Sequence, residues 1–315
     1  MNYLSLVLKN KQFNQIVQDF NNNKASHAYL LVSADNLFVE NIAYMLASNL
    51  TNSNINRVIN NIHPDIFVYG KNGKIDVGQV NDIISNISVA PYEADYKVYC
   101  LLNIESMNEQ SQNKILKSLE EPPKNVIFIL TCCNTKNILN TVLSRVKLLQ
   151  IDTIDNQGIL ELISQKGISN DVAQVAVSCA NGNSTLASKL TTNSFVQMYN
   201  NILDMFNNIK SSRDCLKYVS LFDNKNVDKN EFIDVCILLL RDVSMILSKA
   251  DNLVVNKHHF NYLTQIAQQF SLGALTNIIS ECVNAKEDLY FNTNSTAVLD
   301  KLILVIAQEK VKCKK

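Results

Sequence analysis

The sequence predicts an α/β domain with a parallel sheet in the first half of the chain and helical domains in the second half. In the first half, short apolar runs typical of buried strands alternate with segments of helical spacing, the pattern of a parallel sheet covered by helices. After about Thr153 the strand-like runs fade and only helical spacing continues. The 315 residues include only 7 Gly and 4 Pro, which favours long helices over a loop-rich all-β protein.

Each predicted strand in the first half is a short, mostly apolar run, as expected for a strand buried on both faces. The runs are 28–32, 66–69, 97–102, 126–130 and 146–151. The segments that predict helices are 14–20, 37–50, 80–88, 112–120 and 138–143. The helix over 112–120 must end at Pro122-Pro123, because proline lacks an N–H donor and clashes with the preceding turn.

The second half predicts helices of two lengths. Short helices are expected over 157–165, 171–179 and 185–190. Long amphipathic helices are expected over 196–209, 229–249, 256–270, 273–290 and 295–311. The sequence therefore predicts three parts, an α/β domain over 1–153, a small helical domain over 154–194 and a helical domain over 195–315.

Composition excludes several classes of function. Lys and Arg number 29 and Asp and Glu number 29, so the net charge is zero and any DNA contact must be local or shared with partners. The eight cysteines form no C-x-x-C pair, and their spacing predicts neither a metal site nor disulfides. The N-terminus has no secretory pattern and no apolar run is long enough to span a bilayer, so we expect a cytoplasmic protein without membrane contact. We interpret the basic run Lys310–Lys315 as a solvated tail.

Five segments in a fixed order carry a resemblance to a known family. They are Ser26–Leu30 (SHAYL), His63–Asp65 (HPD), Ile75–Val80 followed by Tyr96–Tyr99, Gln112–Pro123 (QNKILKSLEEPP) and Leu143–Arg145 (LSR). Together they resemble bacterial DNA polymerase III clamp-loader subunits of the tau/gamma and delta-prime type, within the AAA+ superfamily. The resemblance covers about residues 1–190 and implies a RecA-like sheet, then a lid domain, then an all-α C-terminal collar domain.

A member of this family that hydrolyses ATP needs the loop G-x-x-x-x-G-K-[ST], whose backbone N–H groups and Lys bind phosphate. Aligned on SHAYL, the loop here begins at Ser33 and contains Asn36. Ser33 and Phe38 replace the two glycines, Val39 replaces the Lys and Glu40 replaces the Ser or Thr. A carboxylate about 4 Å from a phosphate would cost about 4 kcal/mol at an effective dielectric of 20. The loop is therefore degenerate.

Three other parts of an ATP site are also missing. The acidic pair that orients Mg²⁺ maps to Leu102 and Asn103, neither of which is acidic. The Thr that senses phosphate maps to Cys132 or Cys133, and the small-domain Arg maps to Thr185. We expect no intrinsic ATPase activity and no cofactor.

One cation of the family pattern remains. Ser144 and Arg145 match the Ser-Arg of the family's Ser-Arg-Cys motif, and Val146 replaces the Cys. The resemblance implies that Arg145 is an arginine finger, which acts in trans on the ATP site of a neighbouring subunit. A lost ATP site with a retained finger is the pattern of delta-prime subunits.

The partners implied by this pattern are the tau/gamma ATPase subunits and the delta subunit, in a heteropentamer joined by the collar. The sliding clamp and primer-template DNA would be contacted indirectly. The chain would be an accessory subunit of the DNA polymerase holoenzyme during DNA replication. Two other interpretations stay open, a degenerate ATPase of tau/gamma type and a AAA+-derived scaffold outside replication.

Other polar residues receive structural interpretations. We interpret His27 as a polar cap at the start of the first buried strand and His63 as a turn residue before Pro64. Glu120 and Glu121 could suggest paired catalytic carboxylates, but their place before two prolines favours a helix end.

Overall fold

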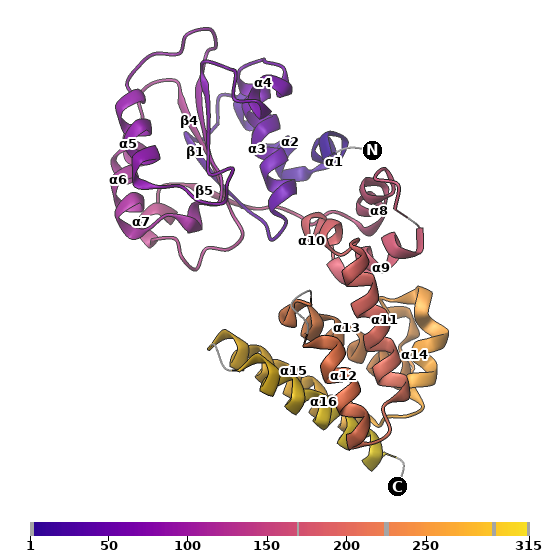
Figure 1. Cartoon of the computed structure of the whole chain (residues 1–315). Helices are drawn as coiled ribbons and strands as arrows, with labels where there is room; N and C mark the ends of the chain where they lie inside the picture. Colours follow the sequence, from indigo (N-terminus) through magenta and orange to yellow (C-terminus); the bar gives the residue numbers. More distant parts are fainter. Residues whose placement is uncertain (1–2, 169, 224–226, 292–293, 314–315) are drawn as a thin grey trace. The chain divides into compact units, whose positions relative to one another are not determined.

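The computed structural model describes residues 3–168, 170–223, 227–291 and 294–313 (Figure 1). The chain forms two compact units. The first comprises Met1–Gln165 with Gly182–Leu186, and the second comprises Lys166–Asn181 with Ala187–Lys315. The division into three parts at 153 and 194 stays a prediction.

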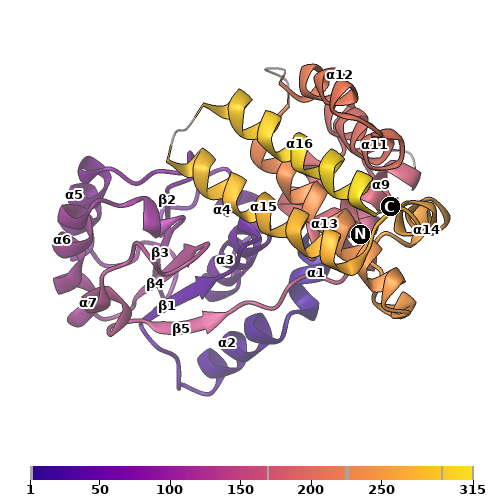
Figure 2. The same ribbon diagram turned by 90° about the horizontal axis from the view of Figure 1, so that it is seen from below.

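Within the described residues, the first unit contains a five-stranded parallel sheet in the order β2-β3-β4-β1-β5 (Figure 2). Central strands are buried along their whole length, whereas the two edge strands alternate between more and less buried residues. The strands are β1 (Ala28–Val32), β2 (Ile66–Tyr69), β3 (Lys97–Leu101), β4 (Val126–Cys132) and β5 (Lys147–Gln150). The predicted α/β fold with a parallel sheet is confirmed.

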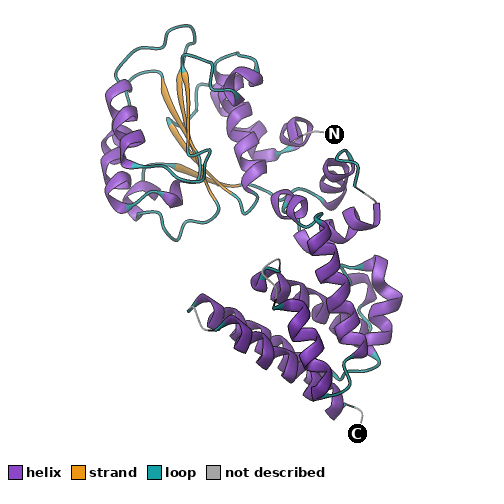
Figure 3. Ribbon diagram, viewed as in Figure 1, coloured by secondary structure: helices purple, strands orange, loops and turns teal. Residues whose placement is uncertain are grey.

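Helices cover both faces of this sheet (Figure 3). One face carries α1 (Tyr3–Lys9), α2 (Lys11–Asn21), α3 (Asn36–Leu50) and α4 (Ile55–Ile59). The other face carries α5 (Val77–Asn86), α6 (Glu109–Glu120) and α7 (Asn140–Leu143), whose apolar side chains join the strands in one buried core. The single-turn helix η1 (Ile104–Ser106) follows β3, and α8 (Asn156–Ser164) follows β5. The sequence patterns did not predict α1 or α4, which are short.

The second unit is helical in its described residues. Its helices are α9 (Asn170–Ala180), α11 (Asn193–Asn208), α12 (Ser212–Phe222), α13 (Lys229–Leu247), η2 (Asp251–Leu253), η3 (Lys257–His259), α14 (Phe260–Ala267), α15 (Leu272–Tyr290) and α16 (Ser295–Lys312). Helix α10 (Ser184–Lys189) begins in the first unit and ends in the second. No helix among the described residues is long and apolar enough to cross a membrane.

Helix α12 was missed by the sequence analysis, although its first turn carries a signal. The side chains of Ser211 and Asp214 form a capping box with each other's backbone N–H groups. A Ser followed three residues later by an acidic residue is a recognised mark of a helix start.

The predicted helix over 256–270 is shorter in the structure because its start is bound elsewhere. Asp242 of α13 is fully buried and accepts hydrogen bonds from the backbone N–H groups of Val255 and Asn256 at 3.1 and 2.8 Å. It also accepts one from the Asn256 side chain at 2.7 Å. These bonds hold Asn256 outside the helix, so α14 begins only at Phe260.

The interpretation of the C-terminal lysines as a solvated tail is wrong for Lys310. Helix α16 continues to Lys312, and Lys310 is only 1% exposed. Its ammonium group donates to the carbonyl oxygens of Phe206 and, at 2.8 Å, of Asn207. These carbonyls lie in the last turn of α11, where no intrahelical donor is available. Lys310 therefore caps another helix.

Candidate functional site

The degenerate loop between β1 and α3 is closed by its own side chain. Asp35 is 2% exposed and is the N-cap of α3, where its carboxylate accepts from the backbone N–H of Phe38 at 3.2 Å. Helix α3 already begins at Asn36, so only Ser33, Ala34 and Asp35 lie between strand and helix. A loop this short leaves no wrapped backbone to surround a phosphate.

The Asp35 carboxylate also binds a segment far along the chain. It accepts from the backbone N–H of Ser184 at 2.6 Å and of Thr185 at 3.3 Å, and from the Thr185 hydroxyl at 2.7 Å. The same hydroxyl oxygen accepts from the backbone N–H of Leu37 at 3.0 Å. The Leu37 and Phe38 N–H groups at the start of α3, which could have bound an anion, are thus satisfied within the chain.

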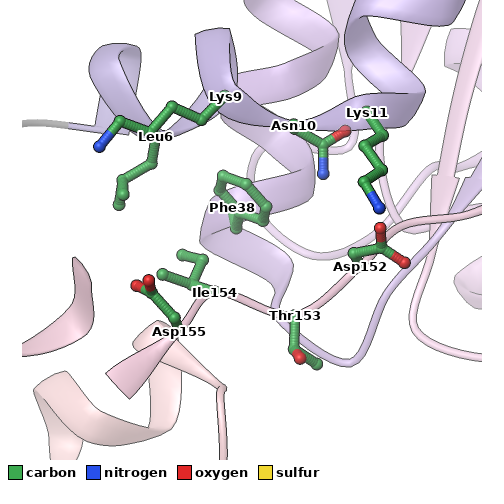
Figure 4. A pocket seen from close by; sticks show the side chains of 9 residues that line it. All are labelled: Leu6, Lys9, Asn10, Lys11, Phe38, Asp152, Thr153, Ile154 and Asp155. Atoms are coloured by element: carbon green, nitrogen blue, oxygen red, sulfur yellow. The ribbon is translucent and has the colours of Figure 1, made fainter. Parts of the chain in front are cut away.

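Phe38 and Val39, which the sequence analysis assigned to the loop, are buried residues of α3. Phe38 and Val39 are 3% and 1% exposed. Figure 4 shows the Phe38 ring in a pocket of about 220 Å³ between the start of the chain and the segment after β5. Its other lining residues are Leu6, Lys9, Asn10, Lys11, Asp152, Thr153, Ile154 and Asp155. This volume is below the roughly 300–1,000 Å³ of typical ligand pockets.

Two positions of the degenerate site meet each other. Burial raises the pKa of Glu40, while its hydrogen bond with Asn103 and the charge of Lys71 lower it in part. Asn103 has a left-handed backbone (φ +57°), which Asn tolerates better than most residues, and its N–H donates to the Thr131 hydroxyl at 3.1 Å. Leu102 is fully buried. Where Mg²⁺ chemistry would need two carboxylates, the chain has an amide bonded to Glu40.

Cys132 is the buried last residue of β4, and Cys133, which follows it, is bonded within the chain. The Cys133 thiol donates to the Asn36 side chain at 2.8 Å, and the Cys133 N–H donates to the Glu105 carboxylate at 2.7 Å. Burial and the nearby Glu105 raise the pKa of the Cys133 thiol, so it stays protonated and a poor nucleophile at neutral pH. In the described part of the chain, no group of three or more His, Cys, Asp and Glu could hold a metal ion.

Arg145 and the loop lie at opposite ends of the strands of the sheet. β1 and β5 are parallel neighbours; the loop follows the end of β1, and Arg145 precedes the start of β5. The loop and Arg145 therefore lie at opposite ends of the strands, about 13 Å apart along the four residues of β5 alone. Arg145 cannot serve the loop of its own chain.

One guanidinium nitrogen of Arg145 is bound to its own helix turn, and the other forms an exposed ion pair. Its Nη1 donates to the Thr141 carbonyl at 2.8 Å and to the Ser144 hydroxyl at 3.1 Å. Its Nη2 donates to the Glu120 carboxylate at 3.0 Å, and the two side chains are 29% and 57% exposed. Ser144 thus orients the guanidinium. Glu120 ends α6 as the sequence predicted, and it also pairs with Arg145.

Around Arg145 the surface forms an open hollow of about 620 Å³. Its other lining residues are Ser26, His27, Leu119, Glu120, Ser144, Val146 and Lys147. The His27 ring bonds the Leu119 carbonyl at 2.8 Å, which ties the start of β1 to the end of α6. Lys147 is paired with Asp19 at 2.6 Å. Arg145 therefore lines a hollow that is open to solvent.

Two family models and several known proteins are similar to this chain. Two family models match, "DNA polymerase III, delta subunit" over residues 8–155 and "DNA polymerase III, delta subunit, C terminal" over residues 193–307. The delta-prime subunit of DNA polymerase III from Bacillus subtilis is 21% identical over 326 residues, covering 98% of each chain. The chain belongs to the delta-prime family of clamp-loader subunits.

Two further relatives support the delta-prime assignment and the fold. The delta-prime subunit of Haemophilus influenzae is 26% identical over 227 residues, covering 68% of this chain and 69% of its own. The structure of a DNA polymerase III gamma subunit-related protein from Thermotoga maritima is 15% identical with a TM-score of 0.50, and covers 95% of this chain and 100% of its own. The latter shows that this delta-prime chain has the same fold as that gamma subunit-related protein.

The HPD segment of the delta-prime chain forms a network that the sequence analysis did not find. His63 Nδ1 accepts from the Asp65 N–H at 3.1 Å, so Nε2 carries the proton and faces Glu93 at 3.2 Å. Asp65 accepts from the backbone N–H groups of Tyr92, Glu93 and Ala94 at 2.6, 2.8 and 2.9 Å. The segment therefore holds the loop before β3, and no local sequence pattern indicated these bonds, because Asp65 and its donors are 27–29 residues apart.

This network predicts acid sensitivity of the first unit. Burial raises the pKa of Asp65, but its three backbone donors outweigh that effect and hold the pKa below its usual range. Burial lowers the pKa of His63. Both residues therefore contribute to stability at neutral pH. The contribution of His63 is lost as pH falls below about 6.5, and the contribution of Asp65 is lost below about 4.

Asp65→Asn removes the charged acceptor and is expected to destabilise the chain by about 2 kcal/mol at pH 7. The measurement is urea unfolding followed by circular dichroism at several pH values. The difference between variant and wild type should shrink as pH falls through the folded-state pKa of Asp65. A difference that does not change with pH would contradict the role of its charge.

Proposed function

We propose that this delta-prime subunit is a non-hydrolysing stator of the clamp loader and supplies Arg145 as an arginine finger to the ATP site of an adjacent tau/gamma subunit. The single observation that supports the proposal best is the position of Arg145. It lies beside an open hollow, at the end of the strands opposite to the closed loop of its own chain. A cation placed there cannot reach the loop of its own chain, but it is open to another molecule.

The contacts of Arg145 suit a finger. Arginine is always charged, and its planar fork matches phosphate oxygens. The Nη1 bonds keep the side chain oriented, while Nη2 can exchange the Glu120 carboxylate for a phosphate oxygen. An exposed ion pair of this kind is worth about 0–1 kcal/mol, so the exchange is cheap. The direct test is a loader reconstituted with Arg145→Ala.

The non-hydrolysing part of the proposal is supported by the closed loop. Asp35 fills the anion position at the start of α3, and Val39 stands where a phosphate-binding Lys would be. The proposed partners are the tau/gamma and delta subunits in a heteropentamer, with the clamp and primer-template DNA reached through them. Family membership favours this role over a scaffold outside replication.

The isolated chain is expected to bind no ATP at millimolar nucleotide. Equilibrium dialysis with labelled ATP and Mg²⁺ measures this, with a tau/gamma subunit from the same source as the positive control. Because the loop is closed, we expect a dissociation constant above about 10 mM, which corresponds to less than about 3 kcal/mol of binding free energy. Saturable binding below 1 mM would instead favour the degenerate ATPase.

A further inference from the structure

We propose that Asp35 is a positioning residue whose carboxylate replaces a bound phosphate and holds segment 182–186 on the first unit without nucleotide. The inference rests on the proposed function, because it supplies the physical reason why a stator needs no ATP to keep this segment in place. It concerns contacts inside the chain, so it can be tested on the isolated protein.

Segment 182–186 has an unusual place in the molecule. It belongs to the first unit, although the residues on both sides of it, 166–181 and 187–315, belong to the second. Nothing in the local sequence requires this. The segment is attached by hydrogen bonds to residues about 150 positions earlier in the chain.

Asp35 is the centre of that attachment. Its carboxylate accepts one bond from the first turn of α3 and three from Ser184 and Thr185. Three other contacts hold the same segment. The Asn183 amide donates to the Ala34 carbonyl at 2.9 Å, and the Tyr3 and Ser184 hydroxyls lie 2.9 Å apart.

The third contact needs a glycine. Gly182 has φ +84°, and a Cβ there would lie 2.9 Å from the Thr153 side chain. The chain can therefore approach the first unit this closely only with glycine at position 182.

These contacts resemble those of an anion-binding site in which the Asp35 carboxylate takes the place of the bound anion. Backbone N–H groups at a helix start and from a second segment converge on one negative group, as they would on a phosphate. In the described part of the chain, no Lys or Arg lies within ion-pair distance of Asp35 in the structure. A carboxylate that is 2% exposed without a cation is stable only because its hydrogen bonds are complete.

A built-in anion differs from a nucleotide in one consequence. A bound nucleotide holds two segments together only while it is bound, and its hold changes on hydrolysis. The Asp35 carboxylate is covalently part of α3's N-cap, so its hold on 182–186 is permanent. The position of the segment becomes independent of ATP concentration.

The test compares three variants of the isolated full chain by hydrogen–deuterium exchange. Asp35→Asn preserves the N-cap of α3, because Asn is as good a cap as Asp, but presents an NH₂ group in place of one acceptor. Asp35→Ala removes all of its bonds. Asp76→Ala is the matched control, because Asp76 also caps a helix of the first unit, α5, where its carboxylate accepts from the Gln79 N–H at 2.8 Å.

We expect Asp35→Asn and Asp35→Ala to raise exchange in segment 182–186 at least tenfold, while strands β1 and β4 exchange as in wild type. Asp76→Ala should leave the segment unchanged. Formate fits the space of the lost carboxylate, so 100 mM sodium formate, compared with the same concentration of chloride, should slow exchange in Asp35→Ala but not in wild type.

Three results would overturn the inference. The first is unchanged exchange at 182–186 in both Asp35 variants. The second is a uniform rise of exchange over the whole first unit. The third is a lack of formate effect in Asp35→Ala together with wild-type exchange in Asp35→Asn. The finger role of Arg145 is measured in the reconstituted loader, so either proposal can fail while the other stands.

Discussion

Replacing Arg145 by alanine is expected to lower the rate of ATP hydrolysis at the adjacent site of a reconstituted clamp loader by about 10³-fold or more, the usual worth of an arginine finger. The hydrolysis transition state spreads negative charge over the phosphoryl oxygens, and Arg145 lines an open hollow with its guanidinium oriented by the Ser144 hydroxyl. The measurement is single-turnover phosphate release in the presence of clamp and primed DNA, where one site's share of the amplitude should disappear.

Matched variants separate the finger from a structural role. Arg145→Lys keeps the charge but loses the planar fork, so an intermediate rate is expected. Glu120→Gln removes only the exposed ion pair and should change the rate less than about fivefold. Arg213→Ala removes an exposed arginine of the second unit and should change nothing.

Wild-type phosphate release from an Arg145→Ala loader that still elutes as the complete assembly would reject the finger. An Arg145→Ala subunit that no longer assembles would be compared with Arg145→Lys, which keeps the contacts to Thr141 and Ser144 within reach. An equal loss of rate for Glu120→Gln and Arg145→Ala would mean that the ion pair itself, and not the free guanidinium, matters.

Replacing Lys310 by methionine is expected to destabilise the second unit by about 2–4 kcal/mol, although Lys and Met have similar volumes. The substitution leaves the carbonyl of buried Phe206 and that of half-buried Asn207 without their donor, and each such loss costs up to about 1–3 kcal/mol. Part of this cost is offset because a charge no longer has to be buried. Chemical unfolding followed by circular dichroism at 222 nm measures the change.

Lys312→Met is the control for that substitution. Lys312 lies two residues further along α16, is 67% exposed and pairs with Glu309 at 2.6 Å. An exposed pair contributes about 0–1 kcal/mol, so this variant should stay close to wild type. Equal stability of the two variants would show that the Lys310 bonds contribute no more than a surface contact.

Patterns over a few residues predicted much of the molecule. The three central strands were found because a strand buried on both faces must be mostly apolar along its whole length, and this is visible in runs such as 126–130. The edge strands β2 and β5 are only partly buried, and they were found as short, mostly apolar runs. The departure of Ser33–Glu40 from a phosphate-binding loop was equally visible, because the chemistry of such a loop depends on which side chains are present. The helix over 256–270 was misjudged because Asp242, fourteen residues from Asn256, holds its start.

The sequence by itself determined the parallel sheet, the missing phosphate-binding side chains and the retained Ser144-Arg145 pair, since each depends on residue types in a local pattern. Only the tertiary structure decided that Asp35 binds Ser184 and Thr185, that Arg145 lies at the end of the strands opposite to its own loop, and that Lys310 is buried. Those facts depend on hydrogen bonds between segments roughly 100–150 residues apart. No local pattern encodes such a bond, because its partners meet only when the whole core has packed.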